Sequence, residues 1–347
     1  MVTTMMTNSF AFGLGVGTQN SRGEWLEVFY PRPLQPPSPA LAACIDELGL
    51  EQANNIVLSA EQLLLLKKSL LAAGEPEQAE IAGDISQSQS PAVVVLLRED
   101  VAATTIPEAY LKLHLLSHRL VKPHGTNLSG IFGILPNVAW TSEGAIDLAE
   151  LRERQLAARL RGQVLEVSCV DKFPKMTNYV VPDGVRIAHT ARVRLGAYLG
   201  QGTTIMHEGF VNFNAGTVGP GMIEGRISSG VMVGKGSDLG GSSSTLGTLS
   251  GGGEIVISVG DECLIGANAG IGIPLGDRCT VEAGLFVTAG TKVMIIDVDG
   301  NAVESIKARE LAGKPDLLFR RNSATGTVEC LSNRTAVELN AELHAHN

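Results

Sequence analysis

The sequence predicts a mainly β protein centred on a left-handed parallel β-helix, because small aliphatic residues recur every six positions between residues 185 and 293. The count slips by four at Ile227 and at Leu275 and is interrupted by a polar loop after Thr245. A period of six fits neither an α-helix, which repeats about every 3.6 residues, nor a half-buried strand, which alternates about every two. It fits a coil in which three short strands make one triangular turn and each face sends one aliphatic side chain inward. Glycine often follows the aliphatic residue, where a turning backbone leaves no room for a Cβ or needs a positive φ. The in-phase positions are Ile187, Val193, Leu199, Ile205, Val211, Thr217, Ile223, Ile227, Val233, Leu239, Thr245, Val259, Ile265, Ile271, Leu275, Val281, Val287 and Val293.

The composition suits a solenoid with a narrow aliphatic interior and excludes several classes of partner. The 347 residues include 40 glycines, and only 4% are aromatic. A net charge of −9 without a Lys/Arg-rich run argues against nucleic acid and against an anionic membrane surface. The five cysteines are scattered and odd in number, which predicts reduced thiols in a cytoplasmic protein. No apolar run approaches about 18 residues and the start lacks a basic leader, so we expect neither a membrane span nor secretion.

Three parts are expected along the chain: an α/β N-terminal domain of one or two lobes over residues 1–170, the β-helix over 171–295 and a small C-terminal cap over 296–347. The N-terminal part lacks the six-residue period. Capping patterns begin helices at Ser59/Gln62 and at Thr105/Glu108. The remaining expected elements are strand and turn over 9–30, a buried strand over 92–97, helices over 40–48, 63–71, 105–118 and 147–161 (the last amphipathic), a hairpin over 295–303, a short helix or turn over 305–311, strands over 317–321 and 327–331, and a terminal helix over 337–344.

Two glycine-rich stretches, 216–224 and 247–254, are expected to interrupt the period as inserted loops. Inserted loops on a solenoid tend to collect on the functional face. The sequence therefore points to the surface near these stretches as the place of a binding site.

Two short segments, EGRIS at 224–228 and FRRNS at 319–323, are the most specific motifs in the stretch from residue 173 to residue 323. This stretch closely resembles one enzyme family, the tetrahydrodipicolinate N-succinyltransferases in their longer-chain variant, which belong to bacterial lysine and diaminopimelate synthesis. The resemblance implies a CoA-dependent acyltransferase that forms a homotrimer with sites between neighbouring subunits. Succinyl would pass from succinyl-CoA to the amine of 2-amino-6-oxopimelate, the ring-opened tetrahydrodipicolinate, with no tightly bound cofactor. Such chemistry needs a base for the ammonium proton, donors for the thioester oxyanion, and cations for carboxylates and phosphates.

The resemblance also implies the site residues. Glu224 matches the family's catalytic glutamate, either as general base or as carrier of a covalent acyl anhydride, and Arg226 matches a contact to a substrate carboxylate. Lys307 and the run from Arg320 to Ser323 match the CoA-binding segment; adjacent arginines on a strand point to opposite sides, so we expect one of them on phosphate. The further matches to ligand-contacting positions are Gly241, Ser244, Ala267, Glu282, Ala283, Gly290, Arg321 and Asn322.

The resemblance also raises the question of a divalent metal ion. Glu208 matches a position where some family members hold a divalent ion, with Mg²⁺ as the candidate, on the trimer axis beside an aspartate. The counterpart of that aspartate is Ala191. Three symmetry-related Glu208 carboxylates could still hold one cation. His207 is the alternative base, since acetyltransferases of this fold often use a histidine.

Two other functions stay open. A related acetyltransferase would use acetyl-CoA on another amine, and a cationic contact for the succinyl carboxylate separates the two. A non-catalytic β-helix would be a scaffold or a histidine-bound metal trimer, but the repeat contains only His189 and His207.

Overall fold

The structure is a computed structural model that describes residues 9–49, 54–247 and 255–332. The chain divides into two compact units: Met1–Val121 with Gly125–Pro174, and Lys122–His124 with Lys175–Asn347. The helix expected over 337–344 and most of the loop expected over 247–254 lie outside the described residues. In the part of the chain that is described, no helix is long and apolar enough to cross a membrane.

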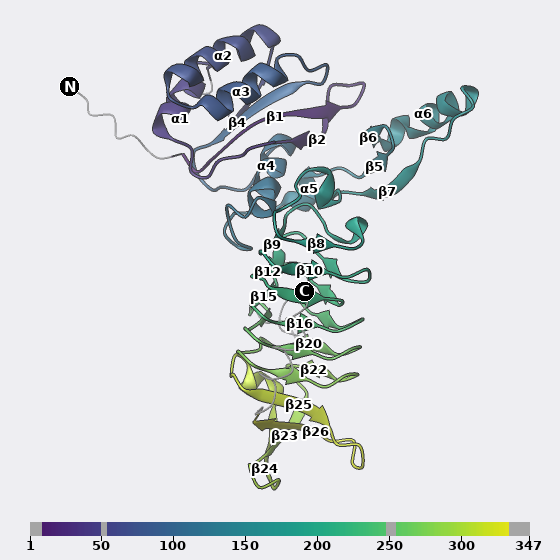
Figure 1. Cartoon of the computed structure of the whole chain (residues 1–347). Helices are drawn as coiled ribbons and strands as arrows, with labels where there is room; N and C mark the ends of the chain where they lie inside the picture. Colours follow the sequence, from purple (N-terminus) through teal and green to yellow (C-terminus); the bar gives the residue numbers. More distant parts are fainter. Residues whose placement is uncertain (1–8, 50–53, 248–254, 333–347) are drawn as a thin grey trace, which may run out of the picture. The chain divides into compact units, whose positions relative to one another are not determined.

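The first unit contains a four-stranded antiparallel sheet of order β2-β1-β4-β3 (Figure 1). Phe12 and Leu14 of β1 belong to a core shared with helices α1 to α3, whereas the Cα of Gly13 faces Tyr30 and Leu111 of α4. Because successive residues of a strand face opposite sides, the helices cover both faces of the sheet. The bounds are β1 Ala11–Gln19, β2 Trp25–Phe29, β3 Asn55–Leu58, β4 Ala92–Leu97, α1 Pro39–Asp46, α2 Ala60–Ala72, α3 Pro76–Ile85 and α4 Ile106–Ser117.

The capping patterns are confirmed at one helix and half formed at another. Ser59 Oγ accepts from Gln62 N (3.2 Å) and Gln62 Oε1 accepts from Ser59 N (2.9 Å), which closes the capping box of α2. Thr105 caps α4 by accepting from Glu108 N at 3.4 Å, but the Glu108 carboxylate bonds Thr104 N instead. Helix α3 was not predicted, although Pro76 at its first turn is a typical start.

A small second lobe of this unit combines helix α6 with a three-stranded sheet of order β6-β5-β7. Its core consists of Ala139, Ile146, Ala158 and Leu165, with Leu151 and Val167 partly buried against them. The amphipathic character expected for the helix is borne out in part: α6 packs Leu151 and Ala158 on this core, whereas Leu160 is 80% exposed. The bounds are α5 Ile131–Ile134, β5 Val138–Thr141, β6 Gly144–Asp147, α6 Leu148–Leu160 and β7 Val167–Asp171.

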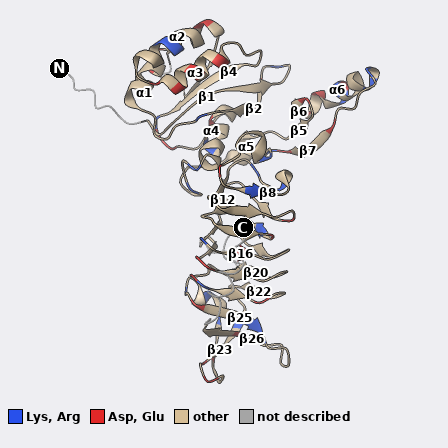
Figure 2. Ribbon diagram, viewed as in Figure 1, with Lys and Arg blue, Asp and Glu red and all other residues tan. Residues whose placement is uncertain are grey.

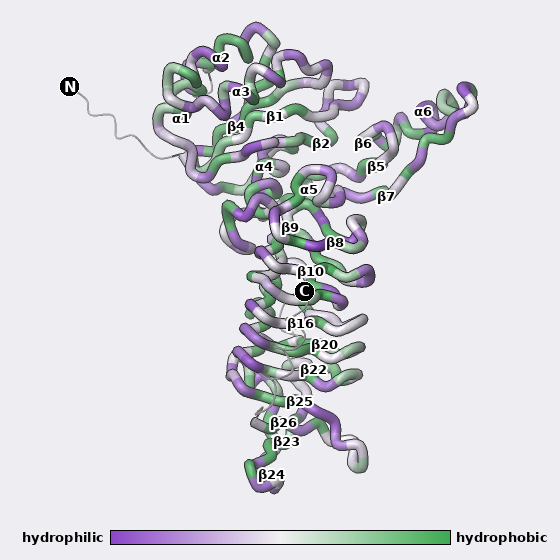
Figure 3. The backbone as a smooth tube through the Cα atoms, viewed as in Figure 1, coloured by the Kyte–Doolittle hydropathy of each residue, from purple (hydrophilic) through white to green (hydrophobic). Residues whose placement is uncertain are grey.

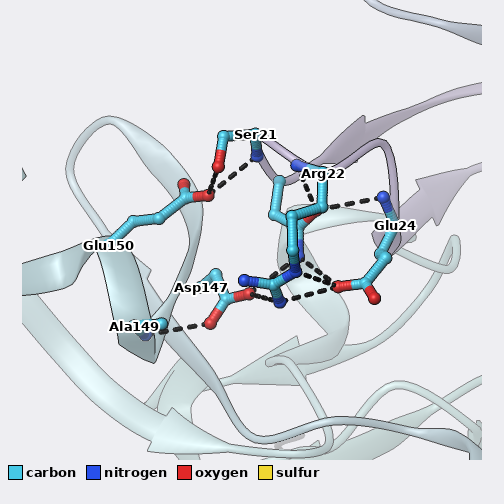
Figure 4. A network of polar contacts seen from close by, with 7 residues as sticks. Ser21, Arg22, Glu24, Asp147, Ala149 and Glu150 are labelled. Carbon is cyan, nitrogen blue, oxygen red and sulfur yellow. Dashed lines mark hydrogen bonds and ion pairs between the residues drawn. The ribbon is translucent and has the colours of Figure 1, made fainter.

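A polar network ties the start of α6 to the turn between β1 and β2 (Figure 4). Asp147, the N-cap of α6, accepts from Arg22 Nη2 at 2.9 Å and from Asn20 Nδ2 at 2.7 Å. Glu150 accepts from Ser21 Oγ at 2.6 Å. These contacts join the small lobe to the turn of the larger sheet. They add to the slight hydrophobic core of the small lobe.

The second unit is a parallel β-helix built from three ladders (Figure 1), with apolar residues recurring along its coils (Figure 3). The in-phase residues from Val193 to Val293 are all at most 3% exposed, so the predicted inward row is confirmed there, whereas its first member, Ile187, is only half-buried. The ladders are β8-β10-β13-β16-β19-β21, β11-β14-β17-β20-β22 and β9-β12-β15-β18. Their bounds are β8 Arg186–Ile187, β9 Ala197–Leu199, β10 Thr203–Ile205, β11 Phe210–Val211, β12 Ala215–Thr217, β13 Gly221–Ile223, β14 Arg226–Ile227, β15 Met232–Val233, β16 Asp238–Leu239, β17 Ser244–Thr245, β18 Ser258–Val259, β19 Leu264–Ile265, β20 Gly270–Gly272, β21 Thr280–Val281 and β22 Phe286–Thr288.

The inserted loop expected at 216–224 is wrong. This stretch forms β12, a turn and β13, and Thr217 and Ile223 are 1% and 0% exposed. Its glycines serve close packing between coils: a Cβ on Gly216 would lie 1.8 Å from Tyr198 O. Glycine-rich sequence here marks tight stacking of coils, not an insertion.

The end of the second unit continues the β-helix and then leaves it. The expected hairpin is formed by β23 (Lys292–Ile296) and β24 (Ala302–Lys307), followed by the short 3₁₀ helix η3 (Ala308–Leu311). Strand β25 (Leu317–Arg321) pairs in parallel with β21 and antiparallel with β26 (Val328–Ser332). The basic residues Arg320 and Arg321 therefore lie on the strand that neighbours β21, the last strand of the first ladder within the regular coils.

Candidate active site

One corner of the β-helix gathers most of the predicted site residues. Each coil passes there from the first ladder to the second, through residues 206–209, 224–225, 240–243, 266–269 and 282–285. We call these five segments the corner column. Glu208, Glu224, Gly241, Ala267, Glu282 and Ala283 lie in it, and Arg226 and Ser244 begin the strands that leave it.

Backbone hydrogen bonds stack the corners on one another. Glu224 N donates to Leu239 O at 2.8 Å and Gly266 N to Val281 O at 2.8 Å. Asn268 N donates to Gly241 O at 2.8 Å, and Gly284 N to Ala267 O at 2.8 Å. Residues far apart in sequence thus lie one coil apart.

The corner at Glu224 is shorter than the other four corners of the column. Ile223 and Ile227 are four positions apart, whereas the inward residues on either side of those four corners are six apart. The tight turn depends on Gly225, where a Cβ would lie 2.1 Å from Ser243 Oγ. Glu224 is half-buried, and its carboxylate makes no hydrogen bond or ion pair with any described residue. A carboxylate held without a partner can accept a proton or attack a carbonyl.

Arg226 lies two residues after Glu224 and is exposed. It pairs in register with Phe210 on one side and Ser244 on the other. Its guanidinium has no ion pair within the described ranges, so a surface salt bridge does not account for it. A free guanidinium is suited to bind a carboxylate in a bidentate manner.

The ladder positions in register with Arg226 continue to Phe286, a residue that the sequence did not indicate. Ser244 pairs with Gly270, and Gly270 pairs with Phe286. The Phe286 ring is 44% exposed and lies on Gly270, where a Cβ would meet its Cε2 at 2.1 Å. No local signal marks Phe286, because its position depends on the glycine one coil away.

Two predicted contacts take different roles. Glu282 uses its carboxylate to hold the cap: Oε2 accepts from Arg321 N at 2.7 Å. Gly290 is exposed, and a Cβ there would meet no atom within 4 Å. Packing therefore does not require glycine at position 290, and an open backbone remains for a ligand.

The basic segment at the end of the β-helix lies on β25, close to β26 (Figure 2). Arg320 Nε donates to Glu329 Oε2 at 2.9 Å, while Arg321 Nη1 donates to Gly326 O at 3.0 Å. The side chains of the two arginines thus bind different partners. Asn322 and Ser323 begin the turn to β26, and Lys307 is exposed at the end of β24.

Glu208 is engaged within its own chain. It accepts from Arg192 Nη2 at 2.8 Å and from His207 Nδ1 at 2.9 Å. The hydrogen bond from His207, followed by the charge of Arg192, lowers the pKa of Glu208. Ala191 supplies no ligand, and the described residues contain no group of three or more His, Cys, Asp or Glu that could hold a metal. The donor set of a single chain does not fit Mg²⁺.

Comparisons with known proteins identify the family of the chain. The family model described as "Tetrahydrodipicolinate N-succinyltransferase middle" matches residues 135–175, and "Hexapeptide repeat of succinyl-transferase" matches residues 256–289. A 2,3,4,5-tetrahydropyridine-2,6-dicarboxylate N-succinyltransferase of Pseudomonas paraeruginosa is 64% identical over 344 residues, which cover 99% of this chain and 100% of that protein. The protein of the same name from Vibrio cholerae is 58% identical over 97% of this chain and 99% of its own length. A solved structure from Campylobacter jejuni, described as a 2,3,4,5-tetrahydropyridine-2-carboxylate N-succinyltransferase, has a TM-score of 0.86 at 34% identity and covers 97% of this chain and 96% of its own.

Proposed function

The chain belongs to the tetrahydrodipicolinate N-succinyltransferase family, and we propose that its reaction takes place on the corner column with Glu224 at the centre. The enzyme transfers succinyl from succinyl-CoA to the amine of 2-amino-6-oxopimelate in lysine and diaminopimelate biosynthesis. The products are N-succinyl-2-amino-6-oxopimelate and CoA. The observation that supports this site is a carboxylate on a shortened corner, Glu224, followed two residues later by Arg226, neither of which has an ion pair among the described residues.

Glu224 supplies the reactive oxygen in either of two routes. As general base, it takes a proton from the ammonium so that the neutral amine attacks the thioester and the CoA thiolate leaves. As nucleophile, it attacks the thioester carbonyl itself, releases the CoA thiolate and forms an anhydride that the amine then opens. Both routes need the carboxylate ionised and free of internal partners.

Arg226 gives the site its preference for dicarboxylic groups. Its guanidinium binds a substrate carboxylate, and a succinyl group carries one that an acetyl group lacks. The small residues Gly241, Ser244, Ala267, Ala283 and Gly290 let the pantetheine arm approach the backbone. Lys307 and Arg320 bind the phosphates at the far end of CoA.

The corner column is one wall of a site, so the active enzyme is a closed trimer in which a neighbouring copy supplies the other wall. The hexapeptide match at 256–289 and the six-residue period support left-handed winding of the coils. All five cysteines are free, which fits a cytoplasmic enzyme. The N-terminal domain ends at about residue 170 and the cap begins at about residue 296.

A thiol-release assay tests the proposal. Purified protein is given succinyl-CoA or acetyl-CoA, with and without tetrahydrodipicolinate. We expect rapid CoA release only from succinyl-CoA in the presence of the amine substrate. Equal rates with acetyl-CoA would favour the acetyltransferase, and no release with either donor would favour the scaffold.

A further inference from the structure

Glu329 holds two residues of the basic segment at once. It lies in β26, directly opposite Arg320 in β25. Its Oε2 accepts from Arg320 Nε at 2.9 Å, and its Oε1 accepts from Asn322 Nδ2 at 2.8 Å. Glu329 is only 7% exposed, so both oxygens are fixed within the sheet.

This contact leaves the two terminal Nη groups of Arg320 available to donate hydrogen bonds. The Nε atom is occupied, while the terminal nitrogens make no hydrogen bond within the described ranges, and 44% of the side chain is exposed. An arginine restrained through Nε presents its two Nη groups in one plane and loses little rotamer freedom on binding an oxyanion. A freely rotating arginine would lose more.

The second contact shapes the turn that follows. Asn322 Oδ1 accepts from Ala324 N at 3.0 Å and from Thr325 N at 3.1 Å. The side-chain amide of Asn322 therefore donates to Glu329 through its nitrogen and accepts from the turn through its oxygen. The hydrogen bond from Asn322, together with Arg320, lowers the pKa of Glu329, so the group is a carboxylate at neutral pH.

We propose that Glu329 is a positioning residue for the phosphates of the acyl-CoA donor, because one buried carboxylate restrains the Arg320 side chain through Nε and fixes the turn that carries Ser323. The inference rests on the proposed function, in which this segment binds CoA. Glu329 does not touch the donor and takes no part in the chemical step.

The sign of one measurement separates positioning from simple electrostatics. Glu329→Gln keeps the length of the side chain but removes the charge and replaces one acceptor oxygen with an NH2 group, which can only donate. If Glu329 positions Arg320, the KM for succinyl-CoA and the Kd for free CoA rise by roughly three- to tenfold, while kcat and the KM for the amine stay unchanged. If Glu329 acted only as a nearby negative charge, its removal would strengthen phosphate binding, and both constants would fall.

A double substitution tests whether the effect passes through the arginine. In an Arg320→Ala background, Glu329→Gln should change the KM for succinyl-CoA by less than about twofold, since no guanidinium remains to be aimed. Glu143→Gln is the matched control. It makes the same change in a carboxylate that pairs with Arg154 at 2.9 Å in the first compact unit, and it should leave every constant unchanged.

Thermal unfolding is measured for all variants. Glu329→Asp keeps the charge but has a shorter side chain, so it should also raise the KM for succinyl-CoA and the Kd for free CoA. An unchanged or lower KM for succinyl-CoA in Glu329→Gln would overturn the inference. So would equal losses for both substrates, which indicate a structural role. Wild-type activity with succinyl-CoA in the same assay shows that the proposed function itself stands.

Discussion

The Glu224 carboxylate faces Gly241 on the adjacent corner, where a Cβ would lie 3.6 Å from Glu224 Oε2. Residue 241 therefore limits the space beside the reactive oxygen. Most glycines of the coils avoid a clash with neighbouring backbone, but a Cβ at position 241 would meet only this carboxylate within 4 Å. A Cβ at this distance is in van der Waals contact with the carboxylate, so alanine fits at position 241 and a larger side chain would crowd Glu224.

Glu224→Gln should abolish most activity. Glutamine keeps the size of the side chain but cannot accept the proton, so we expect the rate to fall by roughly 10² to 10⁴. The base route predicts partial rescue at higher pH, because free amine becomes more abundant. The anhydride route predicts no rescue, and slow CoA release by the wild type without amine. Retention of more than about a third of the wild-type rate would exclude both roles.

Gly225→Ala should distort the corner that carries Glu224. The new Cβ would lie 2.1 Å from Ser243 Oγ and 2.7 Å from Ser243 O. Such overpacking costs about 1–3 kcal/mol, and kcat should fall with the melting temperature. Gly133→Ala is the control, since a Cβ there meets no atom within 4 Å. A Gly225→Ala enzyme with normal stability and kcat would show that the corner can relax.

Lys307→Ala and Arg320→Ala should each raise the KM for succinyl-CoA by roughly tenfold, the equivalent of about 1.4 kcal/mol for one phosphate contact. The KM for the amine substrate should change little. Steady-state kinetics with each substrate varied in turn provides the measurement. Equal increases for both substrates would mean that these residues only support the cap.

Acid should destabilise the first unit through His114. Burial lowers the pKa of His114 to about 3, below the unfolded value of about 6.5. Its Nδ1 donates to Tyr110 O and its Nε2 accepts from Tyr30 N, which fits the neutral ring. The unfolded chain takes up the proton first, so this contribution is complete above pH 6.5 and is lost as pH falls, by up to about 1.4 kcal/mol per unit. Denaturant unfolding between pH 7 and 4 should show this slope, and His114→Gln should reduce it; equal slopes in both proteins would contradict the assignment.

Light scattering should find a trimer that persists at micromolar concentration, because the corner column needs a second wall. The enzyme should lose activity on dilution below the dissociation range. A stable monomer with full activity would contradict the proposal that the active site lies between neighbouring subunits.

The sequence by itself determined the β-helix and its inward row. Burial at every sixth position is a local rule, and the in-phase residues from Val193 to Val293 obey it because each fills the same narrow interior. Similarity to the family also indicated Glu224 and Arg226 before any geometry was known. The capping box at Ser59 was equally readable, since its partners are three residues apart.

Only the tertiary structure decided which residues meet across coils. Gly225 must be glycine because Ser243 lies one coil away, and Phe286 is placed by Gly270. The glycine-rich stretch at 216–224 predicted an insertion, yet Gly216 serves contact with Tyr198. Glu329 reaches Arg320 only because β25 and β26 pair in antiparallel register. Such contacts depend on strand register and on the shape of neighbouring coils, and neither leaves a periodic signal in the chain.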